Sequence, residues 1–292
     1  MRIRAGFDTS RKKAEGVQAV LSKGLGEELK EYVVIHGEFL RLLDRGRLNG
    51  DPVTSAMSRL PRITVPGFPH HVTQRGNRRQ RVFMEDDDYA LYRDWLAQSC
   101  RVNGVEVWSY CLMPNHVHMI LVPSDDLGIS RAVGETHRRY SGSINSRLRV
   151  TGHLFQGRFG SVAMDEPHLM AAFRYVAMNP VKARLSVTAA DWPWSSTPAH
   201  LRGTDDGLVT VKPLLERVEC LSEFLDMPLD PGVEAALERG QTVGRPLMSE
   251  GALIELEKRL GRLMRPGKRG RPAFQEIIHG KTKNSVNSKV SP

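Results

Sequence analysis

The stretch CLMPNHVHMILVP, residues 111–123, decides the fold. The proline and asparagine at 114–115 predict a turn, and the apolar, β-branched residues after them predict a buried strand over 116–122. Side chains on a strand alternate between its two faces, so His116 and His118 point to the same side. The sequence therefore predicts two imidazoles that converge on one site.

Two interpretations of this histidine pair follow from the residue types. Most histidines are hydrogen-bonded structural or surface residues, and two of them one residue apart also occur by chance. A zinc site is the other interpretation, because histidine is the commonest metal ligand and a His-x-His strand supplies two ligands at once. A third ligand and a reactive group elsewhere in the chain are needed to decide.

Composition restricts the class of protein. The chain has 292 residues, 40% of them hydrophobic, which is enough for one or two domains with a proper core. Its net charge of +9 favours a polyanionic partner, nucleic acid before a membrane. The 3 cysteines are an odd set without metal-type spacing, which favours a reducing compartment. With no signal-peptide pattern and no apolar run near the roughly 20 residues that span a bilayer, we expect a cytoplasmic protein.

Periodicity and turn residues predict an alternation of strands and helices in the middle of the chain. Strands are expected at 62–74 with an interruption at 66–69, at 105–112, at 116–122 and near 161–164. Helices are expected from the acidic residues 86–88 to 103, over 129–148, and from a cap at 165 or 166 to 179, where Pro180 stops the helix. The short turn at 113–115 pairs the two central strands antiparallel. The order β-α-β-β-α-β-α predicts an α+β fold, a mainly antiparallel sheet of ferredoxin-like type covered by helices.

The flanking regions predict helical extensions on both sides of this domain. Residues 1–57 carry apolar residues at fourfold spacing, interrupted by glycines, and have no assigned function. The α+β domain is expected over 58–200, and a helical, basic region over 201–292. Within the latter, Ser249 should cap a helix with Leu253, Leu256, Leu260 and Leu263 on one face, and the residues from about 281 should be disordered.

Tyr175 and Asn179 are candidates for the reactive group and the further ligand. They lie four residues apart on the last helix of the domain and therefore share one face. If this helix packs over the strand with His116 and His118, a hydroxyl, a carboxamide and two imidazoles surround one site. Tyr140, with basic neighbours, is a rival nucleophile, and Asn179 before Pro180 is also explained as a simple helix end.

Four segments of the chain resemble, in order and spacing, the motifs of the single-tyrosine HUH transposases, most closely the branch of REP-associated tyrosine transposases. They are MPNHVH at 113–118, GHLFQGRF at 152–159, YVAMNPVKA at 175–183 and WPWSS at 192–196. Single segments of this kind are weak signals, whereas four in order are specific. The resemblance covers roughly residues 60–200, about half of the chain.

The resemblance implies that residues 58–200 form a catalytic domain of the HUH fold. His116 and His118 would be the HUH pair, Tyr175 the nucleophile, and Asn179 the residue that completes a site for Mg²⁺ or Mn²⁺. Asn179 stands where other members of the superfamily use glutamine or another polar ligand. Transposing relatives work as dimers and REP-associated relatives can act as monomers, so the resemblance leaves a homodimer open.

The implied activity is metal-dependent cleavage and rejoining of single-stranded or hairpin DNA. A cation that polarises a phosphate oxygen would let Tyr175 attack in line, forming a 5′-phosphotyrosine and releasing a 3′-hydroxyl. A 3′-hydroxyl can later reverse this step and join strands without ATP.

Basic residues in three places are candidates for DNA contacts, although a solvated charged face is the default for any one of them. They are Arg75, Arg78, Arg79 and Arg81 in one loop; Arg138, Arg139, Arg147 and Arg158 further on; and Lys268, Arg269 and Arg271 near the C-terminus. The last three lie in KRGRP, which resembles an AT-hook core for the minor groove of A·T-rich DNA.

Two rival functions stay open beside the transposase. One is a non-catalytic or host-domesticated DNA-binding protein that retains the fold. The other is a His-x-His zinc hydrolase, for which the sequence offers no third ligand at comparable spacing. Covalent capture of a labelled single strand separates the transposase from both.

Overall fold

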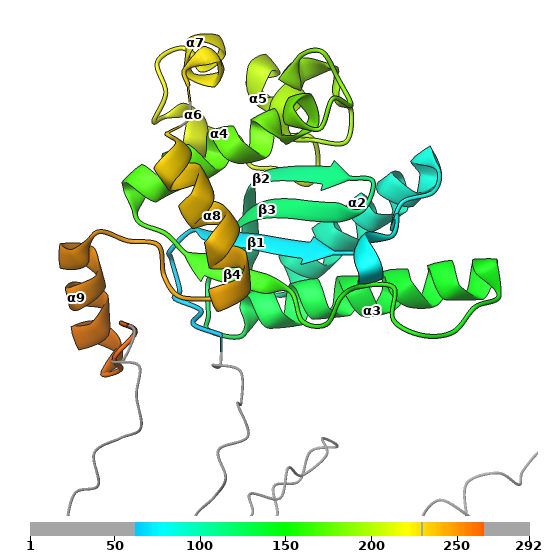
Figure 1. Cartoon of the computed structure of the whole chain (residues 1–292), viewed down its shortest axis with the longest axis horizontal. Helices are drawn as coiled ribbons and strands as arrows, with labels where there is room; N and C mark the ends of the chain where they lie inside the picture. Colours follow the sequence, from blue (N-terminus) through cyan, green and yellow to red (C-terminus); the bar gives the residue numbers. More distant parts are fainter. Residues whose placement is uncertain (1–61, 229, 266–292) are drawn as a thin grey trace, which may run out of the picture. The chain divides into compact units, whose positions relative to one another are not determined.

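The computed structural model describes residues 62–228 and 230–265 (Figure 1). All of them belong to the unit formed by residues 59–292. The helices expected within residues 1–57, the basic motif at 268–271 and the tail from 281 lie outside the described residues.

A four-stranded antiparallel sheet forms the centre of the fold. Its strands are β1 (His70–Arg75), β2 (Val105–Met113), β3 (His116–Pro123) and β4 (Gly160–Ala163), in the order β2-β3-β1-β4. All three neighbouring pairs run antiparallel, and β2 and β3 form the predicted hairpin. The α+β class and the mainly antiparallel sheet are confirmed.

The first strand is shorter than the sequence predicted. Residues 62–69 form no strand, because the chain turns at Gly67, whose φ of 78° is a conformation that glycine adopts at little cost. The Gly67 N–H donates to the Pro123 carbonyl at 2.8 Å, which holds this turn against the end of β3. The strand therefore begins only at His70.

Helices α2 (Asp86–Val102) and α3 (Gly128–Leu148) cover one face of the sheet. They share a core with Val117, Met119 and Leu121, the residues of β3 that point to this face. Reciprocal hydrogen bonds between Glu85 and Asp88 cap the start of α2, where the acidic first turn also suits the positive end of the helix. Helix α3 begins one residue before its predicted start, whereas α2 already includes the acidic residues that were expected to precede it.

Helices α4 (Glu166–Lys182) and α8 (Pro231–Val243) lie on the opposite face. Ile120 of β3 packs there in a second core cluster with Phe173 and Val176 of α4 and Leu237 of α8. Figure 1 shows α8 crossing β1 and β4. Because side chains alternate along β3, His116 and His118 share this face with Ile120 and lie under α4.

The predicted end of α4 at Pro180 is wrong, because the helix continues to Lys182. A Schellman motif closes it: Arg184, with a φ of 57°, donates its N–H to the Val181 carbonyl, and the Leu185 N–H donates to the Pro180 carbonyl, each at 2.9 Å. Pro180 lacks the N–H that would stabilise the last turn. These two bonds stabilise that turn instead of the missing one.

Residues 192–196 run alongside β2. The Trp192 Nε1–H donates to the Leu112 carbonyl at 3.0 Å, and the Leu112 N–H donates to the Trp194 carbonyl at 2.8 Å. The Ser196 N–H donates to the Tyr110 carbonyl at 2.9 Å. Tyr89 of α2 stacks on Trp194 with ring centroids 4.9 Å apart, which fixes the segment to the core.

The remaining described elements are short, namely the 3₁₀ helices η2 (Asn77–Arg79) and η3 (Ala189–Asp191) and the helices α5 (Thr197–Arg202), α6 (Lys212–Leu215), α7 (Leu221–Asp226) and α9 (Glu250–Leu260). Ser249 caps α9 as predicted, by accepting a hydrogen bond from the Ala252 N–H. The predicted leucine face is only partly right: Leu256 is buried, whereas Leu263 is 81% exposed because α9 ends at Leu260. No described helix is both long and apolar enough to cross a membrane.

Candidate active site

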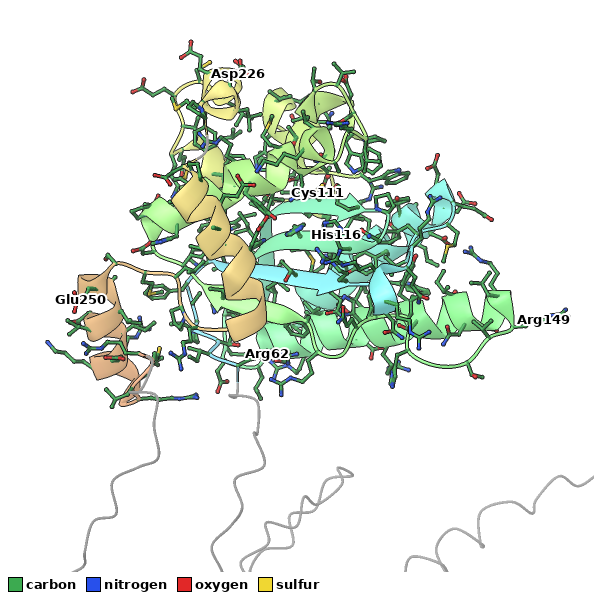
Figure 2. All side chains as sticks on the ribbon, viewed as in Figure 1. Arg62, Cys111, His116, Arg149, Asp226 and Glu250 are labelled. Carbon is green, nitrogen blue, oxygen red and sulfur yellow. The ribbon has the colours of Figure 1, made fainter. Side chains whose placement is uncertain are left out.

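His116 and His118 stand at the start of β3, and Figure 2 labels the first of them. Their ring centroids are 4.9 Å apart and the rings are nearly perpendicular, at 84°. His118 is fully buried, whereas His116 is partly exposed at the edge of the site. The predicted convergence of the two imidazoles is therefore present in the fold.

Helix α4 carries Tyr175 and Asn179 over this pair. The Tyr175 ring lies edge-on to His118, with centroids 5.4 Å apart, and the side chain is 7% exposed. Asn179 hydrogen-bonds to His116, and its Nδ2 donates to the Tyr175 carbonyl at 3.4 Å. The bond to Asn179 opposes the lowering of the His116 pKa, as a bond accepted by the carboxamide Oδ1 does. The fold brings all four predicted residues together.

Burial keeps both imidazoles neutral. Loss of hydration, with the positive charge of Arg75 as a further cause, lowers the pKa of His116 to about 4. Burial also holds the pKa of His118 well below its ordinary value, and the neighbouring His71, His116 and Arg75 add to this effect. A neutral imidazole keeps a lone pair on one ring nitrogen, which is the form that binds metal ions.

A third histidine, His71, belongs to the site and was not predicted. It stands on β1 directly opposite Ile120, on the face of the sheet that also carries His118. His71 Nε2 lies 3.0 Å from His118 Nδ1, and the two rings stack at 5.3 Å and 14°. The Tyr175 ring is 6.0 Å away. The segment HHVTQR predicts a strand, but only the register of β1 against β3 connects His71 to the histidine pair.

The donor set fits a small divalent cation. Two neutral imidazoles and a carboxamide oxygen are ligand types that Mn²⁺ accepts, and oxygen ligands also suit Mg²⁺. Because His71 occupies Nδ1 of His118, Nε2 is the nitrogen of His118 that remains for a cation. Across residues 62–228 and 230–265, no group of three His, Cys, Asp or Glu side chains is arranged to hold a metal. Asn179, which hydrogen-bonds to His116, is the candidate for a third protein ligand.

Three loops border the site at the His116 end of the sheet. Gly76 donates its N–H to the Asn115 carbonyl, and Asn77 donates to the Leu154 carbonyl, both at 2.8 Å. Gln156 donates to the Arg75 carbonyl, also at 2.8 Å. Residues 75–82, 113–115 and 152–159 thus form one hydrogen-bonded rim, which we call the loop rim.

The arginines predicted to contact DNA fall into two groups. Arg75 lies opposite His116 in the sheet register. The others in the first group are exposed on the loop rim, and they are Arg78, Arg79, Arg81 and Arg158. The fold therefore brings five of the predicted arginines to the border of the site.

The second group lies on α3, which covers the other face of the sheet. Arg138 pairs with Glu135 at 2.7 Å. Arg139 sits over the Trp95 ring at 4.6 Å, and Arg147 pairs with Asp88 at 2.7 Å. The fold does not bring these three to the histidine pair. Lys268, Arg269 and Arg271 lie outside the described residues.

The rival tyrosine, Tyr140, is part of the core on that same other face. It is fully buried, and its hydroxyl donates to the Val82 carbonyl at 2.7 Å. Burial raises the pKa of this phenol far above its ordinary value. Tyr140 is thus engaged in packing, on the opposite side of the sheet from the histidines.

These features define a class of protein: an α+β domain whose antiparallel sheet presents a His-x-His pair to a helix bearing a tyrosine and an asparagine. A family model described as IS200-like transposase matches residues 64–179, which include all four of these side chains. Residues 64–179, less than half of the chain, are therefore similar to the IS200-like transposase family.

Two solved structures are similar to the chain at low identity. One is a REP-associated tyrosine transposase bound to a REP hairpin, with 23% identity and a TM-score of 0.44 over 53% of this chain and 92% of that one. The other is a candidate transposase from Deinococcus radiodurans R1, with 20% identity and a TM-score of 0.30 over 42% of this chain and 97% of that one. No curated protein matches the chain.

Proposed function

We propose that this protein cleaves and rejoins single-stranded DNA through a covalent bond between Tyr175 and a 5′-phosphate. The observation that carries this proposal is the position of Tyr175, edge-on to His118 at 5.4 Å on the same helix face as Asn179. A buried tyrosine that served packing alone would not require two imidazoles and a carboxamide on one side of its ring.

His116, His118 and Asn179 would hold Mg²⁺ or Mn²⁺, which supplies positive charge to a non-bridging phosphate oxygen. All three side chains are neutral, so they leave the charge of the cation available to the phosphate. The role of Tyr175 is to attack phosphorus with Oη, so that a P–O bond to the phenol forms as the bond to the 3′ oxygen breaks. The phenol loses a proton and the leaving 3′ oxygen gains one. Because one P–O bond replaces another, the step is reversible and needs no cofactor that is consumed.

The loop rim offers a path for the strand. Five arginines border the site, four of them exposed, and arginine binds phosphate oxygens in a forked geometry. The resemblance of the four sequence segments to the REP-associated branch favours hairpin-containing DNA as the substrate. We expect the protein to act in the cytoplasm, as a monomer or a homodimer.

Covalent capture tests this function with a matched pair of tyrosine variants. The full chain is incubated with labelled single-stranded hairpins and Mg²⁺ or Mn²⁺, and denaturing gels detect label attached to protein. We expect an adduct with the wild type and with Tyr140→Phe, and none with Tyr175→Phe. Tyr140→Phe should cost about 1 kcal/mol of stability through its lost hydrogen bond and leave the chemistry intact.

Two outcomes would contradict the proposal. An adduct that persists in Tyr175→Phe would mean that another nucleophile acts. Hairpin binding by the wild type without any adduct would instead identify a DNA-binding protein that no longer cuts.

A further inference from the structure

We propose that His71 is a positioning residue that fixes the ring orientation and the tautomer of His118, so that Nε2 of His118 faces the cation. This inference rests on the function proposed above and assigns a role to a residue outside the four predicted ones. His71 would touch neither DNA nor cation and would act through His118 alone.

The contact between the two rings is specific. A distance of 3.0 Å between His71 Nε2 and His118 Nδ1 is that of a hydrogen bond, and the stacked rings exclude other partners from that side of His118. Both side chains are buried, with His71 at 1% exposure. Neither ring can turn without breaking this bond inside the core.

The tautomer follows from counting protons. A neutral imidazole carries one N–H, so a His118 that binds a cation through Nε2 must hold its proton on Nδ1 and donate it to His71 Nε2. The reverse arrangement, with His71 donating, would put the His118 proton on Nε2 and block that nitrogen. Of the two neutral arrangements, only the first leaves His118 able to bind. Histidine ligands of metals commonly donate their second ring nitrogen to such a partner.

The hydrogen bond to His118 is the polar contact that the surroundings of His71 in the described part of the chain offer it. Its neighbours across the sheet are Ile120 on one side and Val162 on the other, a row in which an apolar side chain would fit. Its Nδ1 is buried and has no hydrogen-bond partner in the described part of the chain. Burying an imidazole with one unpaired ring nitrogen costs free energy, so a functional role of its other nitrogen would explain why a histidine stands here.

The adjacent His70 differs from His71 in that both of its ring nitrogens have backbone partners. Its Nε2 accepts the Val65 N–H at 3.1 Å, and its Nδ1 lies 2.8 Å from the Phe68 carbonyl. Both of its nitrogens hold the turn before β1, and alternation puts its side chain on the other face. His70 is therefore a structural histidine and the matched control for His71.

Two substitutions separate the hydrogen bond from the packing. His71→Phe keeps a stacked ring and removes the acceptor, whereas His71→Gln keeps an acceptor near the position of Nε2 and removes the ring. Mn²⁺ affinity of the full chain is measured by calorimetry without DNA. We expect His71→Phe to weaken Mn²⁺ binding about 10- to 100-fold, with His71→Gln close to wild type. His70→Phe should lower the melting temperature and leave the Mn²⁺ affinity unchanged.

The ring nitrogens give a second readout that needs neither metal nor activity. Spectra of ¹⁵N-histidine-labelled wild type should show His118 protonated on Nδ1, and His71→Phe should lose that preference. Wild-type His118 protonated on Nε2 would overturn the inference, as would a Phe variant that binds Mn²⁺ like wild type. If both the Phe and the Gln variant bind Mn²⁺ weakly, the inference is also overturned, because His71 would then act through the packing of its ring and not through its hydrogen bond. If the wild type binds no Mn²⁺, the proposed metal site fails, while the nitrogen spectra still decide the role of His71.

Discussion

Asn179 distinguishes this site from one built on carboxylates. A carboxamide is neutral, so it binds a cation less strongly than a carboxylate does and withdraws none of its charge from the phosphate. Its hydrogen bonds to His116 and to the Tyr175 carbonyl join the strand and the helix at one point. Loss of Asn179 should therefore reduce metal binding without abolishing it.

Substitutions at the three proposed ligands should differ in how much cleavage activity they remove. His116→Ala or His118→Ala should remove cleavage, since each change takes away an imidazole ligand. Asn179→Ala should be milder and partly rescued by Mn²⁺, which binds nitrogen ligands more tightly than Mg²⁺ does. Adduct yield measured across Mg²⁺ and Mn²⁺ concentrations checks this order. Full activity of either histidine variant with chelator present would contradict the metal model.

At the scale of residues, sequence spacing could predict which side chains share a face. A spacing of two on a strand and of four on a helix is local geometry, and it predicted that His116 shares a face with His118 and Tyr175 with Asn179. That the two pairs meet at one site was implied by the family resemblance. The place of His71 could not be predicted, because it depends on how β1 is aligned with β3, a contact over 47 residues of chain.

The loop before α2 carries backbone strain at two neighbouring residues. Arg78 and Arg79 are consecutive and have φ values of 51° and 62°, which cost roughly 1–2 kcal/mol each in a residue with a side chain. Hydrogen bonds hold the turn, among them one from Asn115 Nδ2 to the Arg79 carbonyl at 3.2 Å. Strain of this kind gathers at functional sites, and here it directs two guanidinium groups outward beside His116.

Arg79→Gly should therefore stabilise the fold and weaken DNA binding. Relief of the left-handed strain, less the greater freedom of glycine in the unfolded chain, leaves a gain of about 0.5–1 kcal/mol. Loss of one phosphate contact should reduce the salt slope of single-strand binding by about 0.7. Urea unfolding and binding at several salt concentrations measure the two effects.

Arg149→Gly is the matched control for this prediction. Arg149 has a φ of 54°, and Figure 2 shows it at the far tip of α3. The same gain in stability with unchanged DNA binding is expected there. Equal losses of affinity in both variants would mean that Arg79 makes no particular contact.

Element boundaries could be predicted where a local signal dominates. Ser249 was predicted correctly as the cap of α9, and the acidic residues 86–88 marked the region in which α2 begins. The ends that failed depend on the next segment: the turn at Gly67 shortened β1, and the Schellman motif at Arg184 carried α4 past Pro180. Proline and glycine indicate that the chain changes direction nearby, but they do not determine the residue at which a helix or strand ends.

For the molecule as a whole, buried histidines should make the fold sensitive to acid. Burial lowers the pKa of His70 and His71 to about 4, whereas the unfolded chain should titrate near 6.5. Between these values the unfolded state binds more protons, so stability falls as the pH drops. Each such histidine contributes up to about 1.4 kcal/mol per pH unit.

Unfolding by urea at pH 7, 6 and 5 checks this expectation. The free energy of unfolding should decline over that range. In His70→Gln the slope of this decline should be smaller, because about one proton fewer is taken up on unfolding. An identical pH dependence in wild type and variant would show that His70 is already protonated in the fold.

The order of strands and helices in the whole domain could be predicted, and it is confirmed from β1 to α4. The arrangement of the segments beyond α4 could not be. The sequence marked WPWSS as a motif, but its position along β2 depends on contacts with residues about 80 or more positions earlier in the chain, which local spacing does not show. The placement of α8 over β1 and β4 likewise depends on which apolar surface α4 leaves uncovered.

The segment at 192–196 has a practical consequence for anyone who isolates the catalytic domain. The family match ends at residue 179 and includes all four site residues, yet β2 is an outer strand of the sheet. A chain cut to 64–179 would leave the N–H and carbonyl of Leu112 open to solvent, and such an edge recruits strands from other molecules. That piece should self-associate on a sizing column, whereas residues 62–228 should stay dispersed. The smallest piece that resists aggregation is thus set by backbone pairing rather than by the catalytic motifs, and it must reach at least Ser196.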